Sequence, residues 1–333
     1  MARIGVVGAG AWGTTLADVL ARKGHDVSLW ALEPEVVRRI NADHENAIYL
    51  AGFPLDERVV ATGSLAEAVQ DAEFVVSVAP AQHVGAVMGD AAGALRPDTL
   101  VVSASKGIEK TSLETMAGVL RRVLPAGMRT AFISGPSFSR EVAARRPTAV
   151  TVASASPEAA LAAQELFQTP YLRVYTTDDV PGVELAGALK NVIALAAGMS
   201  SGLGLGHNAL AALITRGLAE IARLGIKLGA HPLTFAGLAG MGDLILTCTG
   251  ALSRNRSVGE ALGQGRRLEE ILAGMNTVAE GVDTTRAAYQ LARREQIEMP
   301  IVDEVHAVLF DGRHPRVAVE NLMLREPKPE RWR

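Results

Sequence analysis

Cysteine, aromatic side chains and net charge are all scarce in this chain of 333 residues. Its single cysteine, Cys248, excludes an intrachain disulfide, so the composition gives no support for an oxidising compartment. Aromatic residues make up only 4% of the chain, which argues against a surface that stacks nucleic-acid bases. The net charge of −3 argues against a protein that binds nucleic acid or anionic membranes, because such proteins are basic.

Long apolar runs are missing as well. No uninterrupted run reaches the ~20 residues of a membrane helix, and the nearest, residues 185–205, is broken by Lys190 and Asn191. Arg3 and the apolar residues 4–12 have some likeness to a short signal peptide, but they lack its basic region and cleavage site and fit a strand and turn better. We therefore expect a cytoplasmic protein without stable membrane insertion, and we expect no metal site.

The length favours two domains, at about 100–200 residues per domain. In the first half, short apolar runs typical of buried strands alternate with helix-like stretches. These runs are Arg3–Val7, Val27–Trp30, Phe74–Val78, Leu100–Ser103, Thr130–Ile133, Ala149–Ala153 and Leu172–Tyr175. The alternation predicts an α/β domain of the Rossmann type, a doubly wound parallel sheet covered by helices on both faces.

The pattern changes near residue 180. Asp178-Asp179-Val180-Pro181 has the acidic cap and first-turn proline of a helix start. Beyond it nearly every periodic stretch is helical. We therefore predict a dinucleotide-binding Rossmann domain over residues 1–180 and an all-α C-terminal domain, which binds substrate, over residues 181–333.

The first glycine cluster fits the fingerprint G-x-G-x-x-G with Gly8, Gly10 and Gly13. It follows a predicted strand and opens an amphipathic helix, the context that this short pattern requires. There Gly8 allows a tight turn, Gly10 lets the backbone approach a pyrophosphate, and Gly13 lets the helix pack on the strand. N–H groups at the helix start then bind the anion. The alternative is a glycine-rich turn without a ligand.

The type of dinucleotide depends on residues further along the chain. FAD proteins share the fingerprint, but other flavin-type motifs are missing, so a nicotinamide dinucleotide is favoured. Glu33 lies about 20 positions past Gly13, where an acidic residue binds the ribose 2′-hydroxyl, and residues 31–37 contain no Arg or Lys. Leu32 and Glu33 therefore favour NAD over NADP. The alternative is that Glu33 only caps the next helix.

Two polar clusters come directly after predicted strands. Lys106 follows one strand, and Gly135 and Ser137 follow the next. Ligands of open α/β sheets bind beyond the carboxyl ends of the strands. Lys106 is therefore placed to meet a ligand, and the second cluster offers hydroxyl and N–H groups to a small polar substrate.

Two further clusters lie in the helical half. Lys190 interrupts an apolar helix predicted at 183–200, so it must be paired, extended to solvent or functional. Burial would lower its pKa towards the range useful for acid–base work. Asp243 can orient its ammonium group, and Arg254 and Asn255 can hold a phosphate, because a guanidinium offers forked donors. The alternatives are a solvent-seeking lysine and a solvated basic loop.

Together these clusters resemble the bacterial NAD(P)-dependent glycerol-3-phosphate dehydrogenases. The matching segments are GAGAWGTTLA (8–17), SASKGIE (103–109), ISGPSF (133–138), ALKNVIALAAG (188–198), GMGDLILTCTG (240–250), SRNR (253–256) and AEGV (279–282). They span nearly the whole chain in order. The resemblance implies a 6-phosphogluconate-dehydrogenase-like pair of domains, a homodimer, and a role in supplying glycerol 3-phosphate for phospholipid synthesis.

The resemblance also implies roles for residues at the matching positions. Lys190 is the implied proton donor and acceptor, with Asp243 and Lys106 completing the catalytic group. The implied substrate contacts are Lys106, Gly135, Ser137, Lys190, Asp243, Ser253, Arg254 and Asn255. The implied cofactor contacts are Gly8, Gly10, Ala11, Trp12, Gly13, Leu32, Glu33, Lys106, Ser139, Arg254, Val278 and Glu280.

Two positions depart from the family pattern. Position 32 is often Arg or His in the family, so Leu32 weakens a 2′-phosphate contact and agrees with the lean to NAD. Position 139 is often Ala, and a backbone contact of Ser139 would survive that change. Two other functions stay open: a β-hydroxyacid or ketopantoate-type reductase with the same two-domain plan, and a non-catalytic NAD(P)H sensor.

Overall fold

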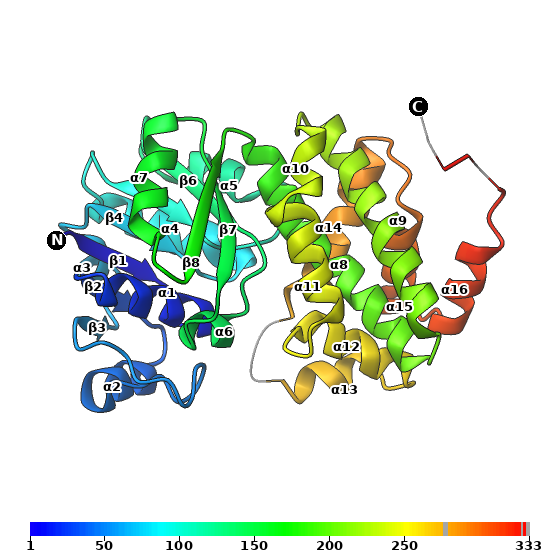
Figure 1. Cartoon of the computed structure of the whole chain (residues 1–333), viewed down its shortest axis with the longest axis horizontal. Helices are drawn as coiled ribbons and strands as arrows, with labels where there is room; N and C mark the ends of the chain where they lie inside the picture. Colours follow the sequence, from blue (N-terminus) through cyan, green and yellow to red (C-terminus); the bar gives the residue numbers. More distant parts are fainter. Residues whose placement is uncertain (276–278, 328, 331–333) are drawn as a thin grey trace.

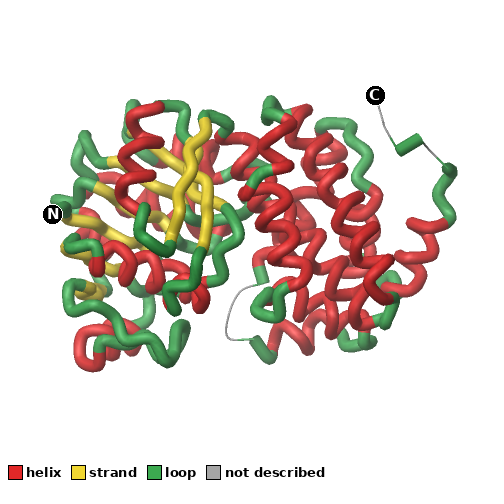
Figure 2. Tube along the Cα trace, viewed as in Figure 1, coloured by secondary structure: helices red, strands yellow, loops and turns green. Residues whose placement is uncertain are grey.

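The computed structural model describes residues 1–275, 279–327 and 329–330. The chain folds into a half built around a β-sheet and a half built from helices, which lie side by side (Figure 1). Figure 2 shows that all strands belong to the first half. This arrangement confirms the predicted fold, a Rossmann-type sheet followed by an all-α part.

The sheet has eight strands in the order β3-β2-β1-β4-β5-β6-β7-β8. Their bounds are β1 Arg3–Val7, β2 Asp26–Trp30, β3 Val59–Thr62, β4 Phe74–Ser77, β5 Leu100–Ser103, β6 Arg129–Ser134, β7 Thr148–Ala153 and β8 Leu172–Thr177. Strands β1 to β6 pair in parallel, so their carboxyl ends meet at one edge of the sheet.

The expectation of a parallel sheet is wrong for one pair of neighbouring strands, because β7 runs antiparallel to β6. Strand β8 is parallel to β7. The connection between β6 and β7 contains only the helix α6, Ser139–Ala143. A parallel crossover usually carries a helix that runs back along the strands, but α6 is one short helix that rises only about 7.5 Å. The chain instead re-enters the sheet near the carboxyl end of β6, where Ser134 pairs with Thr151.

Helices cover both faces of the sheet. They are α1 Ala11–Arg22, α2 Pro34–Asp43, α3 Leu65–Val69, α4 Val84–Ala91, α5 Met116–Val123, α6 and α7 Pro157–Phe167, with short 3-10 turns at Ala81–His83 and Ala92–Ala94. Successive strand residues point to opposite faces. Accordingly Val6 joins the core under α1 and α7, and Val7 joins the core under α3, α4 and α5.

The helical half is built around α8, Val180–Gly202. The surrounding elements are α9 Gly206–Lys227, α10 Pro232–Ala236, a π-turn at Leu238–Gly242, α11 Asp243–Thr249, α12 Arg254–Gly263, α13 Leu268–Ala273, α14 Glu280–Arg294, α15 Pro300–Phe310 and α16 Pro315–Met323. The predicted helix start is confirmed: Asp179 caps α8 by accepting from the Gly182 N–H at 3.0 Å, and Pro181 lies in the first turn.

Helix α8 is the single helix among the described residues that is long and apolar enough to cross a membrane by length and composition. It is instead a core helix, because 83% of its apolar window is buried in the protein. Glycines bring its neighbour close: a Cβ at Gly198 would lie 2.0 Å from the Arg256 carbonyl oxygen, and one at Gly259 would lie 2.0 Å from that of Leu195. The central position of α8 fixes where Lys190 stands.

Candidate active site

Lys190 lies midway along α8, on the side that faces the sheet half. Its side chain is buried, and its Nζ donates to Asp243 Oδ1 at 2.6 Å and to Thr247 Oγ1 at 2.9 Å. It is therefore not a solvent-seeking lysine. A buried ammonium costs much free energy unless it is paired, and this one is paired on α11.

Asp243 begins α11 and joins two lysines from different halves of the molecule. Its Oδ2 accepts from Lys106 Nζ at 2.7 Å, while its Oδ1 accepts from Lys190. Lys106 stands beyond the carboxyl end of β5 and also donates to the Gly135 carbonyl, beyond β6, at 3.2 Å. Four of the predicted site residues are thus in one hydrogen-bonded network, and Ser137 joins it by donating to the Gly135 carbonyl at 3.0 Å.

The charges of this network set its acid–base properties. Burial lowers the pKa of Lys190 to about 8, and the Lys106 charge acts in the same direction against the attraction of Asp243. Burial alone would raise the pKa of Asp243, but the two lysines hold it below its usual range. Two ammonium groups share one carboxylate, so the site keeps an excess positive charge that favours an anionic ligand.

Thr247 is a site residue that the sequence analysis missed. Its hydroxyl donates to the Asp243 carbonyl at 2.6 Å and accepts from Lys190, so it helps to fix the direction of the ammonium. Its spacing was the available signal, because residues four apart in a helix share one face. The structure shows that a helix begins at Asp243, and this start places Thr247 one turn further along the same face.

The glycine turn has the geometry that a dinucleotide needs. Gly8 has φ of +117°, and a Cβ at Gly13 would lie 1.8 Å from the Gly8 carbonyl oxygen. A Cβ at Gly10 would point into open space, so the backbone here can be approached closely. Helix α1 begins next with Ala11 and Trp12, and no side chain caps its N-terminus. These features fit a bound pyrophosphate.

Leu32 and Glu33 stand beyond the carboxyl end of β2. Leu32 is 75% exposed, and Glu33 occupies the N-cap position of α2. Its side chain makes no cap hydrogen bond and instead accepts from the Tyr49 hydroxyl at 2.8 Å. Glu33 therefore takes the cap position that the alternative predicts, but its carboxylate is engaged with Tyr49 rather than with the helix N-terminus.

A third group surrounds the start of α12. Ser253 caps this helix, Arg254 is exposed, and the buried Asn255 accepts from the Gly281 N–H at 3.0 Å through Oδ1. That contact leaves the amide Nδ2 of Asn255 as a donor for a ligand. A Cβ at Gly281 would lie 2.9 Å from the Asn191 carbonyl oxygen, so this group adjoins α8 next to Lys190. Arg254 is exposed, as the alternative of a solvated basic loop predicts. Ser253 and Asn255 are buried, which contradicts that alternative.

The remaining predicted residues link the halves. Glu280 Oε1 accepts from the Ala81 N–H, beyond β4, at 3.4 Å. Burial raises the pKa of Glu280, and the Arg254 charge opposes this shift, so the two groups are neighbours. The Ser139 carbonyl accepts from Thr15 of α1 at 3.3 Å, which places α6 beside the glycine-turn helix. Val278 lies outside the described residues.

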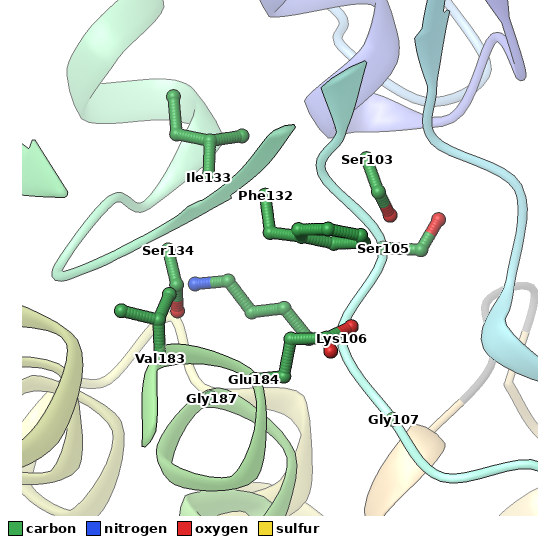
Figure 3. Close-up of a pocket in the computed structure, with 10 residues that line it drawn as sticks. All are labelled: Ser103, Ser105, Lys106, Gly107, Phe132, Ile133, Ser134, Val183, Glu184 and Gly187. Carbon is green, nitrogen blue, oxygen red and sulfur yellow. The ribbon is translucent and has the colours of Figure 1, made fainter. Parts of the chain in front are cut away.

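A small cavity adjoins the network beside Lys106. Figure 3 shows the Lys106 side chain extending from the loop after β5 towards Ser134. Glu184 and Gly187 of α8 lie below it in this view. The size of the cavity and its serine and glutamate lining suit a single water molecule rather than a substrate.

Comparison with known proteins shows the family of this chain. The profile of the NAD-dependent glycerol-3-phosphate dehydrogenase N-terminus matches residues 3–160, and the profile of its C-terminus matches residues 179–320. The chain belongs to this family. The predicted resemblance is thereby confirmed across both halves.

Similar proteins agree with the family profiles. The glycerol-3-phosphate dehydrogenases (NAD(P)+) of Geobacter sulfurreducens and Syntrophotalea carbinolica are 56% and 54% identical to this chain, over 99% and 98% of it and 99% of each relative. A crystal structure of glycerol-3-phosphate dehydrogenase from Coxiella burnetii has a TM-score of 0.94 at 39% identity and covers 97% of this chain and 99% of its own. A ketopantoate reductase from Ralstonia eutropha shares only the fold, with a TM-score of 0.61 at 18% identity over 96% of this chain and 99% of its own.

Proposed function

We propose that this chain interconverts dihydroxyacetone phosphate and sn-glycerol 3-phosphate with a nicotinamide dinucleotide, and that Lys190 moves the proton. The observation that carries the proposal is the pairing of Lys190 with Asp243 at the junction of the two halves. A lysine with a pKa of about 8 can give and take a proton near neutral pH. The reaction is proposed from the family, and Lys190 is proposed as the proton-transfer group from its place in the network.

The cofactor would lie across the carboxyl ends of the parallel strands. Gly8, Gly10 and the N–H groups of Ala11 and Trp12 would hold its pyrophosphate, and Glu33 its adenosine ribose. The chemistry that a bound nicotinamide supplies is hydride transfer to or from C2 of the substrate. On family grounds, Ser139, Val278 and Glu280 would also contact the dinucleotide.

The substrate phosphate would be held by Arg254 and Asn255. Arg254 is exposed at the start of α12, and the Nδ2 of Asn255 is a donor from the buried side of the same turn. Gly135, Ser137 and Ser253 would complete the polar wall. Binding the phosphate away from C2 positions the reacting carbon, which is the contribution that orientation makes to catalysis.

Lys190 would donate a proton to the oxygen on C2 as the ketone becomes an alcohol, and would accept it in the reverse reaction. Asp243 and Thr247 hold its amine in one direction. Lys106 adds positive potential where negative charge develops on the oxygen, which is commonly the largest contribution to catalysis.

We further propose a preference for NAD over NADP, because Leu32 offers no cation to a 2′-phosphate and Glu33 repels one. A domain boundary at residue 180 agrees with the end of β8 at Thr177 and the start of α8 at Val180. A cytoplasmic homodimer that supplies glycerol 3-phosphate for phospholipid synthesis remains part of the proposal on family grounds.

The test is to mix purified protein with dihydroxyacetone phosphate and follow nicotinamide absorbance, with NADH and NADPH in separate cuvettes. We expect rapid loss with NADH and slow loss with NADPH. Equal loss with both would keep the reaction and overturn the cofactor preference. Turnover of ketopantoate but not of dihydroxyacetone phosphate would favour the rival reductase, and binding of NADH without any turnover would favour a sensor.

A further inference from the structure

Glu33 and Tyr49 form a hydrogen bond beyond the carboxyl end of β2. Glu33 is exposed, and an exposed glutamate ordinarily samples many rotamers. Here its Oε1 accepts from the Tyr49 hydroxyl at 2.8 Å, which selects one orientation. The other carboxylate oxygen stays available to accept from a ligand.

Tyr49 is itself fixed by a loop that is attached to the glycine turn. Asn46, only 1% exposed, donates from Nδ2 to the Ala9 carbonyl and to Thr14 Oγ1, each at 2.8 Å. Its Oδ1 accepts from the Tyr49 N–H at 3.2 Å. One buried amide thus ties the backbone of Tyr49 to the turn that would hold the pyrophosphate.

The ring of Tyr49 is also anchored, since it packs against the hydrophobic core under α1. Only two side-chain torsions connect the anchored ring of Tyr49 to its anchored backbone. The hydroxyl oxygen therefore has little freedom to move. The neighbouring carboxylate and partial burial both raise the pKa of Tyr49, so the phenol stays a donor throughout the neutral pH range. The position of the Glu33 carboxylate relative to the glycine turn is set through Tyr49 and Asn46.

We propose that Tyr49 is a positioning residue that determines cofactor selectivity, because it holds the Glu33 carboxylate against the adenosine ribose. A held carboxylate accepts from a 2′-hydroxyl and repels a 2′-phosphate, whereas a mobile one turns to solvent and does neither well. This inference rests on the proposed dinucleotide site. It adds a selectivity role for a residue that contacts no reacting atom.

The experiment measures the dissociation constants of NAD+ and NADP+ by titration calorimetry, without substrate, for the wild type, Tyr49→Phe, Glu33→Ala and the double variant. Tyr49→Phe keeps the packed ring and removes only the hydroxyl. We expect it to lower the ratio of the NADP+ to the NAD+ dissociation constant about fivefold, the effect of one partly solvated hydrogen bond to a charged group. In the Glu33→Ala background, the same change should leave the ratio unmoved.

Tyr175→Phe is the matched control, because Tyr175 is exposed on β8 at the opposite edge of the sheet. It should leave the ratio at the wild-type value. An unchanged ratio in Tyr49→Phe would overturn the proposal, as would wild-type protein that binds both dinucleotides equally. An effect of Tyr49→Phe that persists without Glu33 would also overturn it, by showing direct contact with the cofactor. Failure to turn over dihydroxyacetone phosphate would refute the proposed reaction alone, since these titrations contain no substrate.

Discussion

Asp243, at the junction of the two halves, and Glu220, inside the helical half, are equally hidden from water, with 1% and 2% exposure. Their acidities nevertheless shift in opposite directions. Burial raises the pKa of Glu220 to about 7, although the N–H groups of Ile301 and Val302 oppose the shift. The two lysines around Asp243 outweigh the same burial cost and hold its pKa below the usual range.

The difference teaches that burial by itself does not distinguish a working carboxylate from a structural one. Glu220 accepts from Ile301 N at 2.9 Å and holds the start of α15 against α9. Asp243 instead pairs with two ammonium groups, one of which donates the proton in the proposed reaction. The groups that hydrogen-bond to a buried carboxylate, rather than the extent of its burial, indicate its role.

Removing Lys190 should have the largest effect on activity. Lys190→Ala takes away the proton donor and leaves the glycine turn intact, so we expect kcat to fall by about 10³ or more while NADH still binds. Steady-state kinetics and NADH fluorescence titration measure the two quantities. Lys227→Ala, an exposed lysine at the end of α9, is the control. Turnover near the wild-type level in Lys190→Ala would assign the proton transfer to another group.

Removing the charge of Asp243 should lower stability as well as activity. Asp243→Asn leaves Lys106 and Lys190 facing each other without the anion that compensates them. Breaking a buried ion pair from one side costs about 3–5 kcal/mol. Urea unfolding should show this loss, which the double variant Asp243→Asn with Lys106→Met should partly restore. A stability equal to that of the wild type would show that the lysines have other compensation.

Removing the charge of Glu220 should act on stability alone, in a pH-dependent way. Its pKa is raised in the folded state, so between about pH 4.5 and 7 the folded chain binds more protons than the unfolded chain. Its contribution to the free energy of unfolding therefore falls as the pH rises through this window, by about 3 kcal/mol in total. Glu220→Gln should lose this dependence.

The comparison that isolates this effect is the difference in unfolding free energy between variant and wild type at pH 5 and pH 8. Glu57→Gln, which removes an exposed carboxylate, is the matched control. Kinetic constants should be unchanged in both variants. A parallel pH dependence in Glu220→Gln and the wild type would contradict the assignment of the slope to this residue.

The chemistry of the site was predictable from the sequence where the pattern is local. Gly8, Gly10 and Gly13 carry their geometry in their spacing, and Lys190 is conspicuous as a charge inside an apolar helix. The pairing of Lys190 with Asp243 was anticipated because a buried ammonium needs an anion. These predictions depended on which residue types a tight turn or a buried helix face tolerates.

What the sequence analysis missed depends on contacts between distant segments. Strand β3, Val59–Thr62, has only four residues and lies at the edge of the sheet, so half of its side chains face solvent and its pattern is weak. Tyr49 belongs to an irregular loop, and its contact with Glu33 exists only because Asn46 fastens that loop to the glycine turn. Loop contacts of this kind have no periodic signature.

The last prediction tests the comparison most directly, because it concerns the pH at which Lys190 titrates. Reduction needs the ammonium form, so its kcat/KM should fall about tenfold per pH unit above about pH 8. Oxidation needs the neutral amine, so its kcat/KM should rise up to the same pH and then level off. Full pH profiles in both directions locate this midpoint.

Two neighbours of Lys190 should move the midpoint in opposite directions. The Asp243 charge raises the pKa of Lys190 and the Lys106 charge lowers it. Asp243→Asn should therefore shift the midpoint to lower pH, and Lys106→Met should shift it to higher pH, in whatever activity each variant retains. Burial is nearly the same in both variants, so opposite shifts would show that the neighbouring charges tune the pKa of Lys190 in addition to burial. Shifts in the same direction would contradict the roles assigned to the two charges.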